Sequence, residues 1–234
     1  MPDIKLYRND RSCSMVPHIV LREVNIPFTT VRMRMNSDIG GYDAIDETLS
    51  RSEYIKLNAD AYVPTLVVGG EPLTENLAIL FYLSELCPER HLFGATSWER
   101  AKVTQWLAWL TGTMHGRGFG CVWRPQRFSD DESVWPDIQA KGRKFIGECY
   151  ERIESRLAAG EGYAVGEGLT VVDIYLHTMW RWGGAIGIPV EELKSKYPSW
   201  AKLMRKVEKL KSVRDAMAEE NDTLTFEDGG AAVL

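Results

Sequence analysis

The feature that most constrains the fold is a change of pattern near residue 90 of the 234-residue chain. Before it, short β-type runs alternate with helical segments, as they do in α/β proteins. Gly69-Gly70 separates two of these runs and predicts a hairpin turn. The expected elements are a strand over 4–8, a helix with Ser14 as N-cap, a strand over 28–34, a short helix within 39–58, strands over 63–68 and 71–73, and a helix capped by Thr74.

From residue 96 onward the pattern is helical almost throughout. Thr96 with Glu99, and Thr170 with Asp173, fit the capping box that opens many helices. The helix after Thr170 is apolar on most faces, which is typical of a helix buried inside a bundle. We therefore expect an α/β domain over 1–86, a linker over 87–95 and an all-α domain over 96–234.

The charge balance argues against several classes of protein. The net charge is −5 and no basic patch is evident, so we expect binding neither to nucleic acid nor to a membrane surface. The chain shows no N-terminal signal pattern and no apolar run long enough to span a bilayer. Its four cysteines have neither C-x-x-C nor metal-ligand spacing, so we expect no metal site. A cytoplasmic protein with reduced thiols is the default interpretation.

Cys13 lies where the loop after the first strand meets the first helix. Ser12 and Ser14 flank it, and Pro17 in the first turn is compatible with a helix start. A helix N-terminus favours an anion, above all a thiolate, either that of the cysteine or that of a ligand. The alternative is a buried helical cysteine between capping serines. These residues alone leave both interpretations open.

Three further motifs follow in order along the chain. They are Val63-Pro64 before a strand, Glu75-Asn76 at a helix start, and His115 at the end of the first helix of the second domain. Together with Cys13, this arrangement resembles the cytosolic glutathione S-transferases over nearly the whole chain. The resemblance implies a thioredoxin-like α/β N-terminal domain followed by an all-α C-terminal helical bundle.

Two short runs narrow the resemblance to one class. Ser12-Cys13-Ser14 with Pro17-His18-Ile19, and Leu21-Arg22-Glu23 after them, are most similar to the bacterial beta class. In that class a cysteine occupies the position of Cys13. The implied co-substrate is glutathione, the implied partner is a small electrophile, and the implied assembly is a homodimer, with a role in detoxification.

The resemblance also implies roles for individual residues. Cys13, Ser14 and His115 would be catalytic, because each could hold or tune a thiol. A cis proline would turn the backbone of the preceding residue towards the ligand, which would pair with it like an added strand. The implied glutathione-binding residues are Tyr7, Ser12, Val63, Pro64, Glu75 and Asn76.

Each of these residues has an ordinary structural alternative. Pro64 fits the start of a strand, and Glu75 fits an acidic first-turn residue favoured by the helix dipole. His115 fits a structural histidine between domains. Tyr7 fits a core aromatic at the end of a strand, which we take as the better interpretation.

Departures from the beta-class pattern keep other functions open. Asn76 replaces the usual serine, and Asp60 stands where a lysine is common, so a carboxylate partner for glutathione is lost. Cys13 could instead support thiol–disulfide exchange with glutathione. A glutathione-dependent isomerase is a third hypothesis, although Arg11 replaces the serine expected in that class. The fourth is a non-catalytic module that binds partners or carries ligands.

Overall fold

The computed structural model describes residues 2–36, 40–46, 48–160 and 162–226. These residues group into two compact units. The first contains the chain up to Phe93 together with the described residues from Val207 onward, and the second contains Gly94–Lys206. The first unit carries the Cys13 region and the second carries His115, so each is described by itself.

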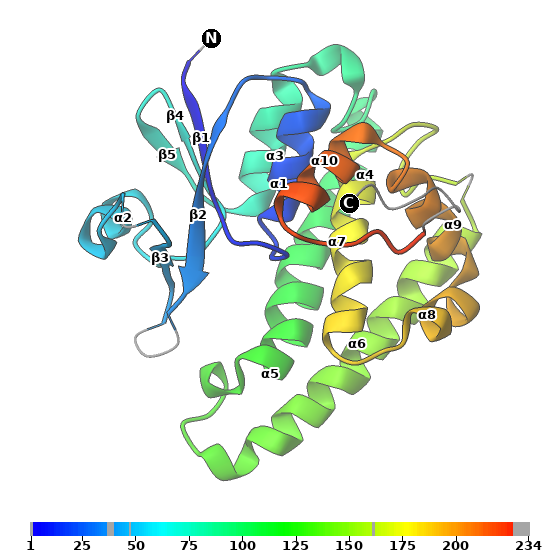
Figure 1. The fold of residues 1–234 in the computed structure, drawn as a ribbon. Coiled ribbons are helices and arrows are strands. Elements are labelled where there is room, and N and C mark those ends of the chain that lie inside the picture. Colours follow the sequence, from blue (N-terminus) through cyan, green and yellow to red (C-terminus); the bar gives the residue numbers. More distant parts are fainter. Residues whose placement is uncertain (1, 37–39, 47, 161, 227–234) are drawn as a thin grey trace. The chain divides into compact units, whose positions relative to one another are not determined.

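A mixed sheet organises the first unit (Figure 1). Its strands are β1 (Ile4–Arg8), β2 (Thr29–Met35), β3 (Tyr42–Ala44), β4 (Thr65–Val68) and β5 (Glu71–Leu73). Among the described residues the order is β3-β2-β1-β4-β5, with β1 parallel to β2 and antiparallel to β4. Gly69 and Gly70 have positive φ, which turns β4 into β5 at little steric cost.

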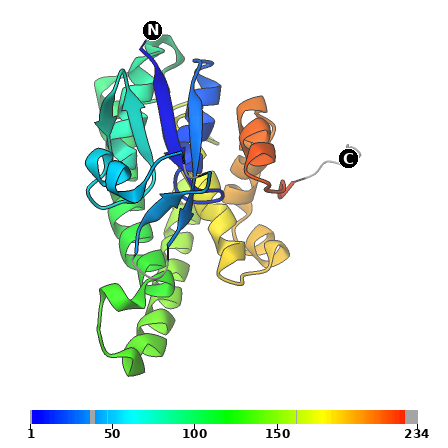
Figure 2. The same ribbon diagram turned by 60° about the vertical axis from the view of Figure 1, so that its left-hand side comes forward.

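Four α-helices belong to this unit. They are α1 (Met15–Glu23), α2 (Arg51–Leu57), α3 (Asn76–Glu85) and α10 (Lys211–Glu219). α1 and α3 lie against one face, and α2 lies on the other (Figures 1 and 2). The first seven residues of α1 are all buried, and each large apolar side chain among them contributes roughly 2 kcal/mol to the stability of the fold.

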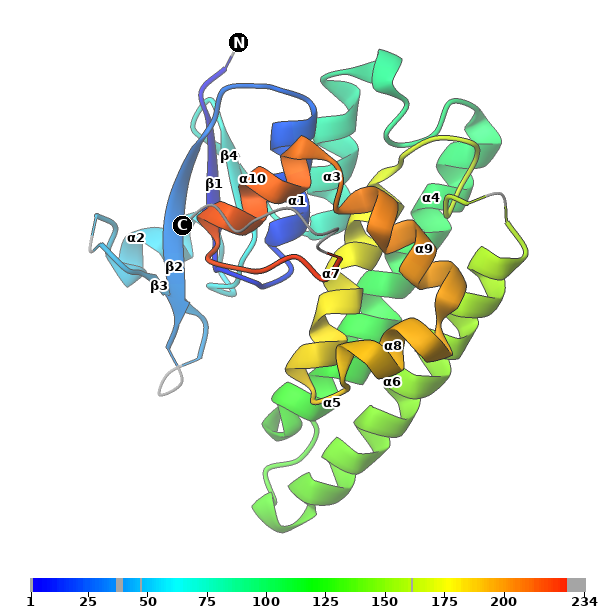
Figure 3. The same ribbon diagram turned by 45° about the vertical axis from the view of Figure 1, so that its right-hand side comes forward.

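The C-terminal helix α10 belongs to the first unit. It packs along α1 (Figure 3), with Val213, Ala216 and Met217 buried. By contrast, the sequence pattern predicts one all-α domain over residues 96–234. No pattern in the sequence indicates that the last helix returns to the N-terminal domain. Neither α10 nor β3 was expected as a separate element, and neither was the short helix α8 (Val190–Lys196).

The second unit is helical. Its α-helices are α4 (Ser97–Ala108), α5 (Gly120–Trp123), α6 (Trp135–Ala158), α7 (Val171–Ala185), α8 and α9 (Pro198–Val207), the last of which ends at the boundary of the unit. Within this unit α6 runs beside α8 and α9 (Figure 3). Single 3₁₀ turns occur in this unit at Pro125–Arg127 and Glu132–Val134, and in the first unit at Pro88–Arg90.

Both expected capping boxes are present. The Thr96 hydroxyl accepts the Glu99 N–H at 3.1 Å, and the buried Asp173 carboxylate accepts the Thr170 N–H at 2.7 Å. The expectation for α7 is also confirmed, because Val171–Trp180 is buried without a break. The helix before α5 behaves differently: Trp109–Phe119 is π-helical.

One of two expected helix caps is wrong. Ser14 is the N-cap residue of α1 as expected, although its side chain makes no capping hydrogen bond because its hydroxyl bonds to the preceding loop instead. The N-cap of α3 is Glu75 rather than Thr74. Among the described residues, no helix is both long and apolar enough to cross a bilayer.

Candidate functional site

The loop between β1 and α1 is held by its own serines. Ser14 is fully buried, and its hydroxyl accepts the Asn9 N–H at 3.0 Å. The Ser12 hydroxyl donates to the Asn9 carbonyl at 2.8 Å and lies 2.8 Å from the Ser14 hydroxyl. Both hydroxyls therefore fix the path of the chain to Cys13.

Three segments that are distant in the sequence meet at Cys13. The Cys13 thiol donates to the carbonyl oxygen of Val63 across 3.4 Å. The side-chain N–H of Asn76, the first residue of α3, donates to the Cys13 carbonyl at 3.2 Å. The Cys13, Val63-Pro64 and Glu75-Asn76 motifs are thus brought together within one unit.

Cys13 is a thiol rather than a thiolate in this environment. Burial raises its pKa to about 12, and the negative charges of Glu75 and Glu220 act in the same direction. Of the interpretations that the sequence left open, this favours a neutral cysteine over a Cys13 thiolate. Loss of water around the sulfur outweighs the hydrogen bonds that favour the anion, and burial of this kind cannot be read from neighbouring residues.

The Val63–Pro64 peptide bond is cis. Pro64 leads directly into β4, and Val63 is buried beside Tyr7 and Tyr54 in the apolar core of the first unit. The implied cis proline is therefore present at the expected position.

A buried polar network that sequence reasoning missed shapes the approach to Pro64. The hydroxyls of Tyr54 and Thr65 lie 2.9 Å apart, and Asn58 donates to Thr65 at 2.9 Å. Tyr54 and Asn58 also donate to the carbonyl of Tyr62, at 2.6 and 2.8 Å. The run between Asn58 and Thr65 is of mixed polarity and includes Asp60, so the sequence does not reveal their pairing.

The start of α3 has an unusual backbone. Glu75 has a φ of +69°, a left-handed conformation that is uncommon for residues other than glycine, and its exposed side chain makes no capping bond. Asn76 is only 6% exposed, and its Oδ1 has no hydrogen-bond partner among the described residues. A buried acceptor without a donor costs free energy unless a ligand supplies the donor.

Tyr7 lies in the apolar cluster formed with Met33, Tyr54, Ala61 and Val63. Its ring centroid is 5.3 Å from that of Tyr54, and burial raises the pKa of its hydroxyl. This environment suits a core aromatic. It does not suit a group that must ionise near neutral pH.

His115 lies in the π-helical segment of the second unit. Its ring centroid is 4.8 Å from that of Trp182, in an edge-on arrangement. Burial lowers the pKa of His115 to about 4, and the charge of Arg127 adds to this effect. The imidazole is therefore neutral at pH 7.

Two family models match separate parts of the chain. The model described as the glutathione S-transferase N-terminal domain matches residues 2–85, and the one described as the C-terminal domain matches residues 136–211. The glutathione S-transferase GstA of Escherichia coli O157:H7 is 29% identical over 220 residues, which cover 93% of this chain and 98% of GstA. The chain belongs to the glutathione S-transferase family.

Solved structures of the family agree with this assignment. A sphingomonad glutathione S-transferase, solved in complex with glutathione, is 27% identical with a TM-score of 0.75, covering 93% of this chain and 98% of that one. A bacterial beta-class enzyme from Sphingomonas chungbukensis shares the fold at 24% identity and a TM-score of 0.75, covering 94% and 100%. The expected fold, a thioredoxin-like domain followed by a helical domain, is confirmed.

Proposed function

We propose that the chain is a glutathione transferase that binds glutathione as its thiolate and directs it at a small electrophile. The observation that carries this proposal is the meeting of Cys13, Val63 and Asn76 around one point of the first unit. Membership of the family supports the activity, and the glutathione held by the sphingomonad relative supports the co-substrate.

The residues present suit the parts of glutathione. The backbone N–H and C=O of Val63 would pair with the cysteinyl unit, since the carbonyl is freed when the Cys13 thiol turns to the glutathione sulfur. The first N–H groups of α3 would receive the γ-glutamyl carboxylate. Asn76 Oδ1 and the exposed Glu75 carboxylate would take the ammonium, which satisfies the orphaned amide oxygen.

Cys13 acts as a hydrogen-bond donor in this proposal. Its single S–H, which donates to the Val63 carbonyl in the free protein, would turn to the glutathione sulfur on binding and so favour the anionic form of that sulfur. The glutathione thiolate then forms a carbon–sulfur bond with the electrophile, whose leaving group departs with its electron pair. Ser12 and Ser14 hold the loop in this scheme, and Tyr7 supports Val63 from the core.

Thiol–disulfide exchange by Cys13 is less favoured. Exchange requires a thiolate nucleophile, and burial raises the pKa of Cys13 far above neutral pH. An isomerase is also less favoured, because Arg11 replaces the expected serine and its side chain bonds to Asn221. A non-catalytic binding module is the outcome if glutathione binds without turnover.

A comparison of retention and turnover tests the proposal. The protein is passed over immobilised glutathione and then assayed with a chlorinated aromatic and with a glutathione mixed disulfide. We expect retention and conjugation, with little reduction of the disulfide. A protein that does not bind glutathione, or that only reduces the disulfide, would contradict the proposal. The finer expectations of a detoxifying role, a cytoplasmic location and a homodimer rest on resemblance to the family.

A further inference from the structure

A buried ion cluster joins the C-terminal helix to the loop that carries Cys13. Its centre is Glu220, which directly follows α10 and is fully buried. Glu220 Oε1 lies 2.8 Å from His18 Nδ1 and 3.8 Å from Arg8 Nη1, so it faces α1 and β1 together. Replacing buried charged groups one at a time is costly, so such a cluster constrains every segment that it joins.

The other oxygen of Glu220 reaches the backbone of the loop itself. Glu220 Oε2 accepts the Arg11 N–H at 2.6 Å, two residues before Cys13. The Arg11 side chain donates to the Asn221 carbonyl and forms an ion pair with Asp222. The segment 220–222 therefore holds both the backbone and the side chain of Arg11.

Arg11 needs this support because its backbone is strained. Its φ of +61° lies in the left-handed region, which costs a residue other than glycine about 1 kcal/mol or more. Such a conformation persists only where surrounding contacts over-determine it. The chain then turns through Ser12 to Cys13, so a relaxed Arg11 would move the thiol away from Val63.

We propose that Glu220 is a positioning residue for the proposed glutathione site: through the Arg11 N–H it fixes the loop that presents Ser12 and Cys13. This inference rests on the proposed function for its effect on catalysis, but its effect on Cys13 stands apart from any turnover. The charge of Glu220 also helps to raise the pKa of Cys13. Glu220 therefore influences both the position of the Cys13 thiol and its pKa.

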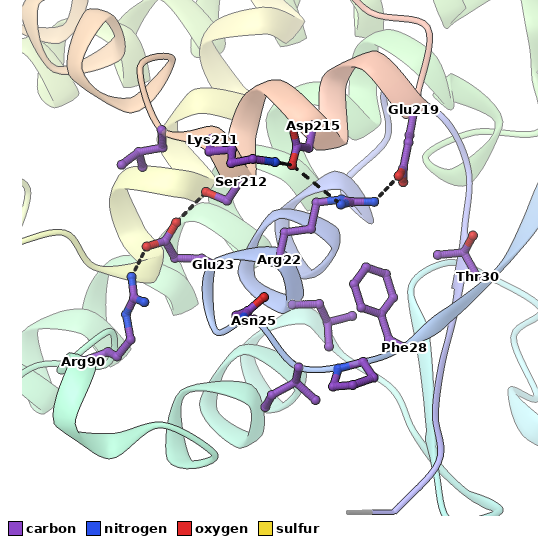
Figure 4. Close-up of a pocket in the computed structure, with 14 residues that line it drawn as sticks. Arg22, Glu23, Asn25, Phe28, Thr30, Arg90, Lys211, Ser212, Asp215 and Glu219 are labelled. Carbon is purple, nitrogen blue, oxygen red and sulfur yellow. Dashed lines mark hydrogen bonds and ion pairs between the residues drawn. The ribbon is translucent and has the colours of Figure 1, made fainter.

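The contacts that α10 makes with Arg22 and Glu23 of α1 do not involve Arg11, so a residue among them can serve as a control. Figure 4 shows Arg22 of α1 between Asp215 and Glu219 of α10, and Glu23 between Ser212 and Arg90. These side chains line a cleft of about 1050 Å³ beside the helix pair. None of these contacts includes the Arg11 N–H.

The test uses Glu220→Ala, Glu220→Gln and Glu219→Gln in the full-length protein. Glu219 contacts the other nitrogen of His18, at 3.0 Å, so Glu219→Gln changes the same cluster without changing the Arg11 bond. Three readouts are taken: exchange of the Arg11 amide proton by NMR, pH-dependent alkylation of Cys13 resolved by peptide mass spectrometry, and KM for glutathione against kcat.

We expect Glu220→Ala to speed Arg11 exchange and raise KM for glutathione, each by roughly tenfold, as loss of a charge-assisted hydrogen bond requires. In Glu220→Gln the amide oxygen still accepts the Arg11 N–H, so exchange and KM change little. Because the charge is gone, alkylation of Cys13 begins at lower pH in this variant. Glu219→Gln should match the wild type in all three readouts.

Distinct results overturn the inference. Unchanged Arg11 exchange and unchanged KM in Glu220→Ala would exclude the positioning role. If Glu220→Ala does not fold, Glu220→Asp takes its place, because its shorter side chain withdraws the carboxylate from the Arg11 N–H: unchanged Arg11 exchange and unchanged KM in that variant would exclude the role. Absence of turnover in the wild type would instead remove the proposed function, while exchange and alkylation would still decide the role of Glu220.

Discussion

The chemistry of Cys13 depends on its surroundings more than on its position before a helix. Its thiol donates to the Val63 carbonyl, and burial keeps it protonated at neutral pH. If Cys13 acts as a hydrogen-bond donor, another donor side chain can take its role, whereas a hydroxyl cannot take the role of a nucleophilic thiolate. The distinction gives a prediction at the scale of one residue.

Cys13→Ser should keep conjugation within a few-fold of the wild type, because the serine hydroxyl also donates a hydrogen bond. Cys13→Ala removes the donor, and we expect kcat/KM to fall by roughly tenfold, the effect of about 1.4 kcal/mol. Steady-state kinetics with a chlorinated aromatic measures both changes. Cys87→Ala is the control, because that thiol bonds to Val24 instead. Equal losses in the serine and alanine variants would argue that Cys13 acts as a nucleophile.

The protonation of His115 gives a prediction about pH. Its pKa is lowered from 6.5 to about 4 by burial, so the unfolded chain binds more protons between these values. The stability that His115 contributes is therefore fully present above pH 6.5 and is lost as pH falls towards 4, by roughly 3 kcal/mol. NMR titration of the ring, assigned with His115→Gln, should give a midpoint near 4. A midpoint near 6.5 would contradict the burial seen around Trp182.

At the scale of elements, the network before β4 determines how the chain reaches Pro64. Thr65→Val removes the hydroxyl that Tyr54 and Asn58 share, but both keep the Tyr62 carbonyl. We expect a loss of about 1 to 2 kcal/mol in the free energy of unfolding, measured by urea denaturation. Thr29→Val, on the exposed side of β2, should change it by less than about 0.5 kcal/mol. A loss of similar size in both variants would count against the network.

The elements that were predicted correctly have strong local signals. The hairpin at Gly69-Gly70 and the capping boxes at Thr96 and Thr170 depend on residues that are close in the sequence. The π-helical form of Trp109–Phe119 was not predicted, because its glycines indicate only a loosened helix. Ser14 is the N-cap residue of α1 as predicted, but it lacks a side-chain capping bond because the Asn9 backbone competes for the same hydroxyl.

At the scale of the whole molecule, the order of elements was enough to identify the family. The meeting of Cys13, Val63 and Asn76 agrees with the resemblance, which implied that residues of these three segments serve one ligand. The return of α10 to the first unit could not be predicted. It depends on Glu220, Arg11 and His18, which meet only after folding.

The central claim is that bound glutathione is held as a thiolate by a neutral donor at Cys13. Titrating the thiolate absorbance of glutathione bound to the wild-type protein tests this most directly, with S-methylglutathione as the blank. The account predicts that the bound thiol ionises well below the value of about 8.5 for a free thiol. Cys13 itself should stay protonated across the same range. A bound thiol that ionises at or above its value in water, or ionisation of Cys13 in its place, would contradict the account.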